Sequence, residues 1–290
     1  MQLTDMRLTD IRPDDTFAFS YPSLPERFDG VADRFPGIPL LVMDGERRVV
    51  CGHDLLLLLR RRGETRARVL RVELAVADGL LLNFNVLDGL FGLNLYEKLL
   101  FAGKISSWLA PGEIQRRAAL GFLLSDSLRQ RLPILLSEPF RHCLAFGRIS
   151  LKTALKLADQ AEADRLALLG IFQASGFSES QQGLIVQAME KIAFREKKPM
   201  AAILAAGDLT ALLDEEMPQK KFMEALDMRR CPAFARMERE WKAWRSKAER
   251  GGGLSLRHAP FFSREEIQVT LTVKNRADAE KLLARLKKIG

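Results

Sequence analysis

Arg129, Gln130 and Arg131 form the run of side chains with the most specific possible chemistry in this sequence. Arginine forms paired hydrogen bonds with guanine edges or with phosphate, and glutamine does so with adenine edges. Neither residue type needs a metal or a cofactor for such contacts. The run therefore predicts contact with nucleic acid, provided that one element exposes all three side chains.

The element expected to carry this run is a helix. Leucines at 128, 132 and 135 recur at helical spacing, which places the polar residues on the other sides. Ser125 is suited to cap the first turn, and Ser127 with Gln130 fits a capping box one step later. Pro133 falls inside the stretch and is expected to end or kink the helix, because proline has no backbone N–H.

A shorter helix is expected before it, opening after Pro111-Gly112. Ile114 and Ala118 contribute to its apolar face, and Gly121 is suited to end it. Two helices around a tight turn, the second with exposed Arg and Gln, are the parts of a helix-turn-helix, here near 112–136. An ordinary pair of helices in an all-α domain, with arginines on a solvated face, fits the same pattern.

A hairpin followed by a helix is expected upstream. Residues 39–42 form an apolar strand, Asp44-Gly45 makes a turn, and residues 47–51 form the second strand. The sequence Gly52-His53-Asp54 then leads into a helix over residues 55–62. This order indicates a small α/β domain at the N-terminus.

Taken in order along the chain, these segments resemble the ParB family of chromosome and plasmid partition proteins. The hairpin and glycine turn are similar to the N-terminal domain of the ParB and sulfiredoxin superfamily, residues 150–154 resemble the stretch that follows the family's helix-turn-helix, and residues 254–290 resemble its dimerisation module. The resemblance implies a DNA-binding protein. Its expected DNA-binding residues are Ser125, Ser127, Arg129, Gln130, Arg131 and Lys152.

The resemblance also concerns a nucleotide site. In nucleotide-binding ParB proteins, the arginines of a Gly-x-Arg-Arg box hold the triphosphate of CTP. The residues of this chain that resemble the family's two boxes, as a degenerate version, are Gly52, His53, Asp54, Asn85 and Glu97. Asp54 puts a negative charge where phosphate would lie, which is repulsive. We therefore expect no cofactor, and weak or no binding of CTP and Mg²⁺.

The C-terminal segment is expected to form a homodimer. Gly251 to Gly253 make a linker, residues 267–273 alternate as a half-buried strand, and Asn275 caps a last helix. About forty residues with one sheet face and one helix stripe bury too little surface to be stable alone, and a symmetric partner would complete the core. The expected interface residues are Val269, Leu271, Val273, Leu282, Leu286 and Ile289.

Length and charge fit a modular DNA-binding protein. The chain has 290 residues, 47% of them hydrophobic, which predicts two or more domains with cores of their own. We expect an α+β protein with a small α/β domain over 1–105, an all-α domain over 106–250, and a small β-β-α module over 254–290. The net charge of +8 favours polyanionic partners.

The cysteines, the histidines and the hydropathy of the chain argue against several classes of site and of protein. Cys51, Cys143 and Cys231 are isolated, and the three histidines are far apart, so we expect no metal site. Cys51 precedes the glycine turn as a sulfiredoxin cysteine would, although a small buried residue is the simpler interpretation. No apolar run reaches the ~18 residues of a membrane span, and the N-terminus is not a signal peptide. A cytoplasmic, nucleoid-associated protein without membrane contact is expected.

The predicted function is sequence-specific binding of double-stranded DNA, in plasmid or chromosome partition or in transcriptional regulation. A partition ATPase is an expected partner. The alternatives are a CTP-dependent, nucleotide-hydrolysing DNA clamp, a sulfiredoxin-like or nuclease enzyme, and a ParB-like interaction scaffold without DNA binding.

Overall fold

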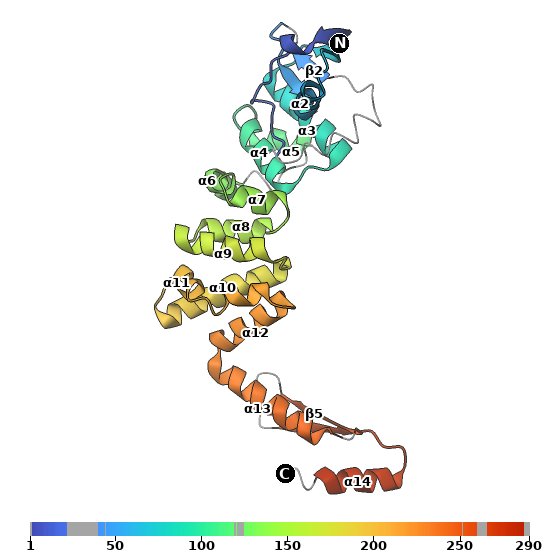
Figure 1. The fold of residues 1–290 in the computed structure, drawn as a ribbon, viewed down its shortest axis with the longest axis vertical. Coiled ribbons are helices and arrows are strands. Elements are labelled where there is room, and N and C mark those ends of the chain that lie inside the picture. Colours follow the sequence, from blue (N-terminus) through green and yellow to red (C-terminus); the bar gives the residue numbers. More distant parts are fainter. Residues whose placement is uncertain are drawn as a thin grey trace. The chain divides into compact units, whose positions relative to one another are not determined.

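The computed structural model describes residues 2–21, 40–43, 45–118, 120, 125–250, 252–259 and 266–286. The chain forms two compact units, Met1–Gly183 and Leu184–Gly290 (Figure 1). Each unit is rich in helices and has one small sheet, of four strands in the first and two in the second. This mixture agrees with the predicted α+β class. The three-part division at residues 105 and 250 stays a prediction.

Unit one contains the predicted hairpin and the helix that follows it. The sheet order is β1-β4-β2-β3, with β4 parallel to β2 and the other two pairs antiparallel. Its strands are β1 (Gln2–Arg7), β2 (Leu40–Met43), β3 (Val49–Cys51) and β4 (Arg66–Val72). Helix α2 (His53–Arg61) packs its buried Leu56 into a core that includes Val42 and Val69. Apolar alternation in the strands therefore supplies the surface on which α2 lies.

The backbone conformation of Gly52 explains why the turn before α2 requires a glycine. Its φ is +94°, in the left-handed region, and it forms the N-cap of α2. A Cβ at this position would lie 2.8 Å from Leu40 Cδ2, so a side chain would also collide with β2. The helix begins at His53, two residues before the predicted start, because the cap is the glycine itself.

The rest of unit one is helical. Its helices are α3 (Val76–Phe91), α4 (Leu95–Ile105), α5 (Pro111–Ala118), α6 (Asp126–Leu135), α7 (Phe140–Ala145), α8 (Leu151–Ala158) and α9 (Glu162–Ala174). Helix α10 (Glu179–Glu196) crosses the boundary between the units. Ser178 and Gln181 form a reciprocal capping box at its start, with hydrogen bonds of 2.9 and 3.3 Å. Gly121, predicted to end α5, lies outside the described residues.

Unit two ends in a hairpin and a helix, as predicted. Its elements after α10 are α11 (Met200–Ala205), a 3-10 helix (Thr210–Asp214), α12 (Pro218–Arg230), α13 (Pro232–Ala248), β5 (Leu254–His258), β6 (Ile267–Leu271) and α14 (Arg276–Leu286). The second strand ends at Leu271 and not at 273. Asn275 accepts a hydrogen bond of 2.9 Å from the Asp278 N–H, which confirms the predicted cap. None of the described helices is long and apolar enough to cross a membrane.

Candidate nucleic-acid interface

Helix α6 has the cap and the apolar face that its sequence predicts. The Ser125 hydroxyl accepts a hydrogen bond of 3.3 Å from the Leu128 N–H. Leu128, Leu132 and Leu135 are all buried. Pro133 does not end the helix, which continues to Leu135. Proline is tolerated here because the buried leucines on both sides hold the turn against the rest of unit one.

The predicted capping box at Ser127 is not formed. Since Ser125 is the cap, Ser127 already lies inside α6. Its hydroxyl accepts a hydrogen bond of 2.6 Å from Arg131 Nη1, and the same nitrogen donates to the Ser127 carbonyl at 2.6 Å. Ser127 therefore orients Arg131 and does not cap the helix.

The three polar residues are not equally exposed. Gln130 is exposed, but Arg129 and Arg131 are only partly exposed. The prediction that all three form an open polar side is therefore wrong for the two arginines, because they flank the buried leucines on the helix. The exposed residues of α6 are Asp126, Ser127, Gln130 and Pro133.

Arg131 is bound to the end of α8. Its Nε donates to Asp159 Oδ1 at 2.7 Å, and its Nη2 donates to Asp159 Oδ2 at 2.9 Å. This forked hydrogen bond raises the pKa of Arg131 and lowers that of Asp159. Asp159 follows the last residue of α8, so the pair fixes α6 against α8. Arg131 thus positions the helix that carries Gln130.

Lys152 is exposed near the start of α8. The hydroxyl of Ser150 caps this helix by accepting a hydrogen bond of 3.2 Å from the Thr153 N–H. Because α6 and α8 pack against each other, Gln130 and Lys152 lie on neighbouring helices. These two residues of the predicted DNA-binding set thus lie on helices that touch, and their contact with DNA stays a prediction.

A buried glutamine that the sequence did not single out holds the loop before α8. Gln182 accepts a hydrogen bond of 3.1 Å from the Ser150 N–H. Its amide nitrogen donates to the carbonyls of Arg148 and Phe177, both at 2.9 Å. Three bonds satisfy this buried amide and link the loop to α10. A single polar residue in a polar stretch gives no pattern that would have identified it.

Residues 14–21, which we call the aromatic strap, begin with a turn at residues 15–17 and continue without regular secondary structure. Phe17, Phe19 and Tyr21 alternate along it and are buried. The ring of Phe19 lies 6.5 Å from that of Phe84 and 5.6 Å from that of Phe101, centroid to centroid. The strap was missed in the sequence, although its alternation of aromatic and other residues is the pattern of a half-buried extended chain.

The glycine turn and α3 bind the backbone of the strap. His53 Nε2 lies 3.0 Å from the carbonyl oxygen of Asp14. Burial lowers the pKa of His53, so the ring is neutral, and Nε2 carries the proton because a carbonyl only accepts. The buried Asn83 amide donates to the Phe17 carbonyl at 2.7 Å. Both contacts would persist with other side chains at the strap positions.

Helix α4 binds the other end of the strap. Glu97 is buried, and its carboxylate accepts from the N–H of Tyr21 at 3.2 Å and from that of Asn94 at 2.9 Å. The Asn94 side chain accepts in return from the Glu97 N–H at 2.9 Å, which completes a capping box. Lys104 donates to the Ala18 carbonyl at 2.5 Å, and burial lowers the pKa of Lys104.

The residues that resemble the nucleotide boxes do not converge on one open site. His53 and Glu97 bind the strap, and Asn85 is exposed on α3. Asp54 lies in the first turn of α2. Among the described residues, no group of three or more His, Cys, Asp or Glu side chains is arranged to hold a metal ion.

Cys51 has no nucleophilic character in this structure. It is buried at the end of β3, and burial raises the pKa of its thiol to about 12. The thiolate is the reactive form of cysteine, so this thiol is inert near neutral pH. The geometry supports the interpretation of Cys51 as a buried strand residue.

We expect CTP with Mg²⁺ to bind with an affinity weaker than micromolar. Asp54 adds a negative charge at the glycine turn, while His53 and Glu97 are already bound to backbone groups. Titration calorimetry with CTP, Mg²⁺ and selected cognate DNA measures this affinity. Micromolar binding would contradict the prediction and would show that cations elsewhere hold the triphosphate.

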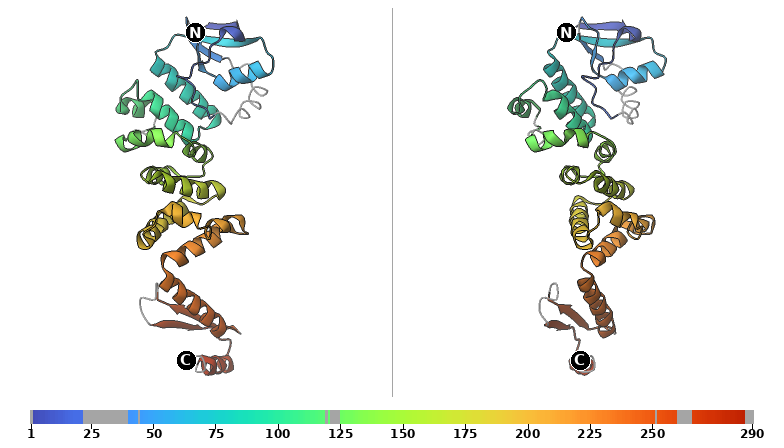
Figure 2. Two further views of the ribbon diagram at one scale, coloured as in Figure 1. Left: turned by 60° about the vertical axis from the view of Figure 1, so that its left-hand side comes forward. Right: turned by 90° about the vertical axis from the view of Figure 1, so that its left-hand side faces the viewer.

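The C-terminal hairpin has one apolar face, which α13 covers only in part. In the β5–β6 ladder, Leu254 pairs with Leu271 and Leu256 pairs with Val269, so all four share a face. Leu254 and Leu256 are buried against α13, whereas Val269 is 42% exposed. Both views in Figure 2 show the hairpin beside α13. On the β6 side of this face, Val269 is therefore open to solvent, whereas Leu271 is packed.

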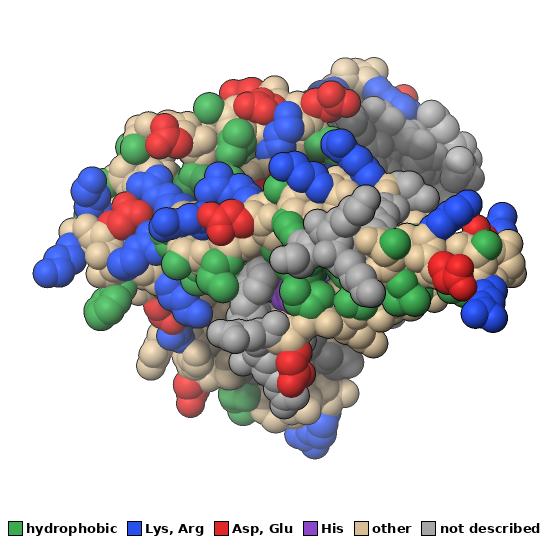
Figure 3. Space-filling view, turned by 90° about the horizontal axis from the view of Figure 1, so that it is seen from below, with side chains coloured by type: hydrophobic (Ala, Val, Ile, Leu, Met, Phe, Trp, Pro, Cys, Tyr) green, Lys and Arg blue, Asp and Glu red, His purple; other side chains and the backbone are tan. Residues whose placement is uncertain are grey.

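The other predicted dimer residues are distributed around this hairpin. Val273 lies beyond β6 and is 44% exposed, and Leu271 packs with the residues that α13 covers. Leu282 is partly buried close to Gly253. The Leu286 side chain and Ile289 lie outside the described residues. Figure 3 views the chain from below and shows apolar side chains exposed among Lys and Arg.

Comparison with known proteins shows a likeness among solved structures alone. No protein-family model and no curated protein matches the sequence. Among solved structures, the fold search matches the C-terminally truncated chromosome-partitioning protein ParB from Caulobacter crescentus, complexed with CTP-γ-S. The match has a TM-score of 0.28 and 17% identity, and covers 59% of this chain and 99% of that chain. A likeness at this TM-score does not establish a family.

Proposed function

We propose that this chain is a ParB-like, sequence-specific binder of double-stranded DNA that acts in partition or in transcriptional regulation. The observation that carries the proposal is the exposed side of helix α6. Helix α6 is capped by Ser125, buries three leucines, and presents Gln130 to solvent. A capped helix with an exposed glutamine is the kind of element that enters a major groove.

Specificity and affinity come from different residues in this proposal. Gln130 contacts a base edge, and exposed Lys152 on the neighbouring α8 contacts phosphate. Arg131 keeps α6 in place through Asp159 and contributes indirectly. The net charge of +8 adds a long-range attraction to DNA.

A homodimer would pair two such units on related half-sites. The open apolar surface around Val269 is the proposed contact, because exposed apolar side chains beside a small core favour a second copy. In a partition system, an ATPase is the further partner that the family resemblance implies.

The DNA contact is tested with Gln130→Ala. Chromatin pull-down with sequencing first supplies the site, and fluorescence anisotropy then gives affinities. We expect specific binding to weaken about tenfold or more, since a bidentate base contact is worth ~1–3 kcal/mol, with non-specific binding unchanged. Gln187→Ala, on the exposed side of α10, is the matched control and should bind like the wild type. Equal affinities for all three proteins would remove Gln130 from the interface.

A scaffold without DNA binding is the second candidate, and the surface of α6 favours it. The exposed stripe of the helix contains Asp126 and Pro133, and Arg131 is occupied by Asp159. A salt titration with random duplex DNA separates the two candidates, because phosphate contacts make binding fall steeply with salt. Absence of salt-dependent binding to any duplex would support the scaffold.

A further inference from the structure

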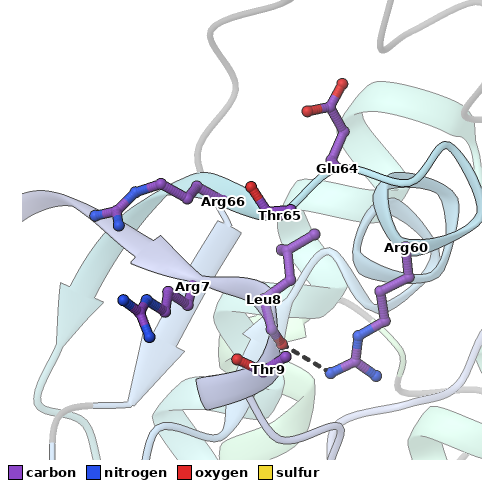
Figure 4. A pocket seen from close by; sticks show the side chains of 7 residues that line it. All are labelled: Arg7, Leu8, Thr9, Arg60, Glu64, Thr65 and Arg66. Carbon is purple, nitrogen blue, oxygen red and sulfur yellow. Dashed lines mark hydrogen bonds between the residues drawn. The ribbon is translucent and has the colours of Figure 1, made fainter.

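A pocket of about 730 Å³ lies where the C-terminal end of α2 meets the start of β4 (Figure 4). Its lining consists of Leu8 and of six residues with polar side chains: Arg7, Thr9, Arg60, Glu64, Thr65 and Arg66. Its volume is within the range of small-molecule sites. The pocket is separate from the glycine turn, because Arg60 is seven residues along α2 from His53, or about 10 Å.

Two of the arginines are placed by the sheet. Arg7 and Arg66 are the last cross-strand pair of the β1–β4 ladder, so their side chains leave the same face. The Leu8 N–H donates to the Thr65 carbonyl at 3.0 Å and closes this end of the ladder. Figure 4 shows the two arginine side chains extending to the same side of the pocket.

The third arginine is fixed by the backbone. Arg60 Nη2 donates to the carbonyl of Leu8 at 3.0 Å and to that of Ile11 at 2.8 Å. Both bonds use one nitrogen, so Nη1 and Nε keep donor capacity for another acceptor. Figure 4 shows Arg60 on the opposite side of Leu8 and Thr9 from Arg7. The guanidinium is thus held in position before any ligand arrives.

The charges of the pocket are unbalanced. The lining contains three arginines but only one carboxylate, that of Glu64. The Glu64 side chain points away from the arginines in Figure 4. Two threonine hydroxyls, of Thr9 and Thr65, are additional donors in the lining. Guanidinium groups form paired hydrogen bonds with phosphate oxygens, so the pocket fits a multiply charged phosphate anion better than a neutral or cationic ligand.

We propose that this pocket binds an oligophosphate anion, with Arg7 and Arg66 on one phosphate group and Arg60 on another. The separation of the arginines into a pair and a single residue favours a chain of phosphates over an isolated one. The proposal goes beyond DNA binding and does not depend on it, because none of these residues belongs to the α5–α6 pair.

Titration calorimetry on the full chain tests the site with three probes: orthophosphate, tripolyphosphate and a nucleoside triphosphate. We expect tripolyphosphate to bind about tenfold or more tightly than orthophosphate, because it reaches both arginine sets. The double variant Arg7→Gln, Arg66→Gln should weaken tripolyphosphate binding about tenfold or more. Thermal unfolding of each variant checks that these exposed substitutions leave the fold intact.

Arg68→Gln is the matched control. Arg68 is exposed on the same face of β4, opposite Asp5, but it does not line the pocket. It should bind tripolyphosphate like the wild type. Equal affinity for tripolyphosphate and the nucleotide supports recognition of the phosphate chain alone. Tighter nucleotide binding that the double variant loses also supports the site, with a nucleoside as part of its ligand. No binding of any probe at millimolar concentration, or an equal loss in Arg68→Gln, overturns the proposal.

Discussion

Phe19→Ala should lower the free energy of unfolding of unit one by about 3–5 kcal/mol. The Phe19 side chain is buried at the centre of the aromatic strap. It contacts Phe84 and Phe101, whose rings are stacked on each other with their centroids 4.2 Å apart. Alanine would leave a cavity between α3 and α4 and would loosen the strap that His53 and Glu97 bind. Denaturant unfolding followed by circular dichroism measures the loss.

Asp15→Ala is the matched control for this variant. Asp15 belongs to the same strap, but its side chain is exposed, so the change should alter stability by about 0.5 kcal/mol or less. If Phe19→Ala unfolds at the same denaturant concentration as Asp15→Ala, the strap is not packed in solution as described above.

Val269→Asp should convert the proposed homodimer into a monomer. An unpaired carboxylate in an apolar interface costs several kcal/mol, which corresponds to a rise in the dimer dissociation constant of about a hundredfold or more. If the proposed helix-turn-helix binds DNA, loss of the dimer would also weaken binding to paired half-sites, because the second copy would no longer be tethered. Size-exclusion chromatography with light scattering measures the mass of the assembly. A DNA titration measures the affinity for paired half-sites.

Thr270→Asp provides the control on the opposite face of the same strand. Thr270 pairs with Ser255, on the polar face of the hairpin, so aspartate there should leave the dimer intact. A wild-type protein that is monomeric at micromolar concentration would contradict the proposed assembly. A dimer that survives Val269→Asp would place the interface elsewhere.

The parts of the fold predicted from the sequence are those set by neighbours along the chain. The hairpin before Gly52, the cap at Ser125 and the cap at Asn275 all depend on residues within a few positions. The alternation of strands and the spacing of helices showed which side chains are buried. These patterns did not show which parts of the chain cover the buried side chains.

Long-range contacts explain most of what the sequence did not reveal. Arg131 had the right type and position for a base contact, but a carboxylate 28 residues away binds it. Glu97 resembled a nucleotide-box residue, yet it accepts from a backbone N–H 76 residues away. A charged side chain in a motif does not reveal the partner it acquires when the chain folds.

The glycines before the last hairpin are a further example. They were expected to separate the C-terminal module from the helices. Gly252 and Gly253 have φ of 74° and 71°, and the strand after them packs against α13. Trp241 and Trp244 contribute to that contact. Gly252 and Gly253 therefore belong to a turn within unit two, and α13 shares a core with the hairpin.

The way the strap is held has a consequence for its mutational tolerance. His53, Asn83, Glu97 and Lys104 bind carbonyl and N–H groups, which every residue type except proline supplies in full. Saturation mutagenesis of residues 14–21 should therefore give an alternating profile. The three buried aromatic positions would accept few replacements, while the positions between them would accept most residues other than proline.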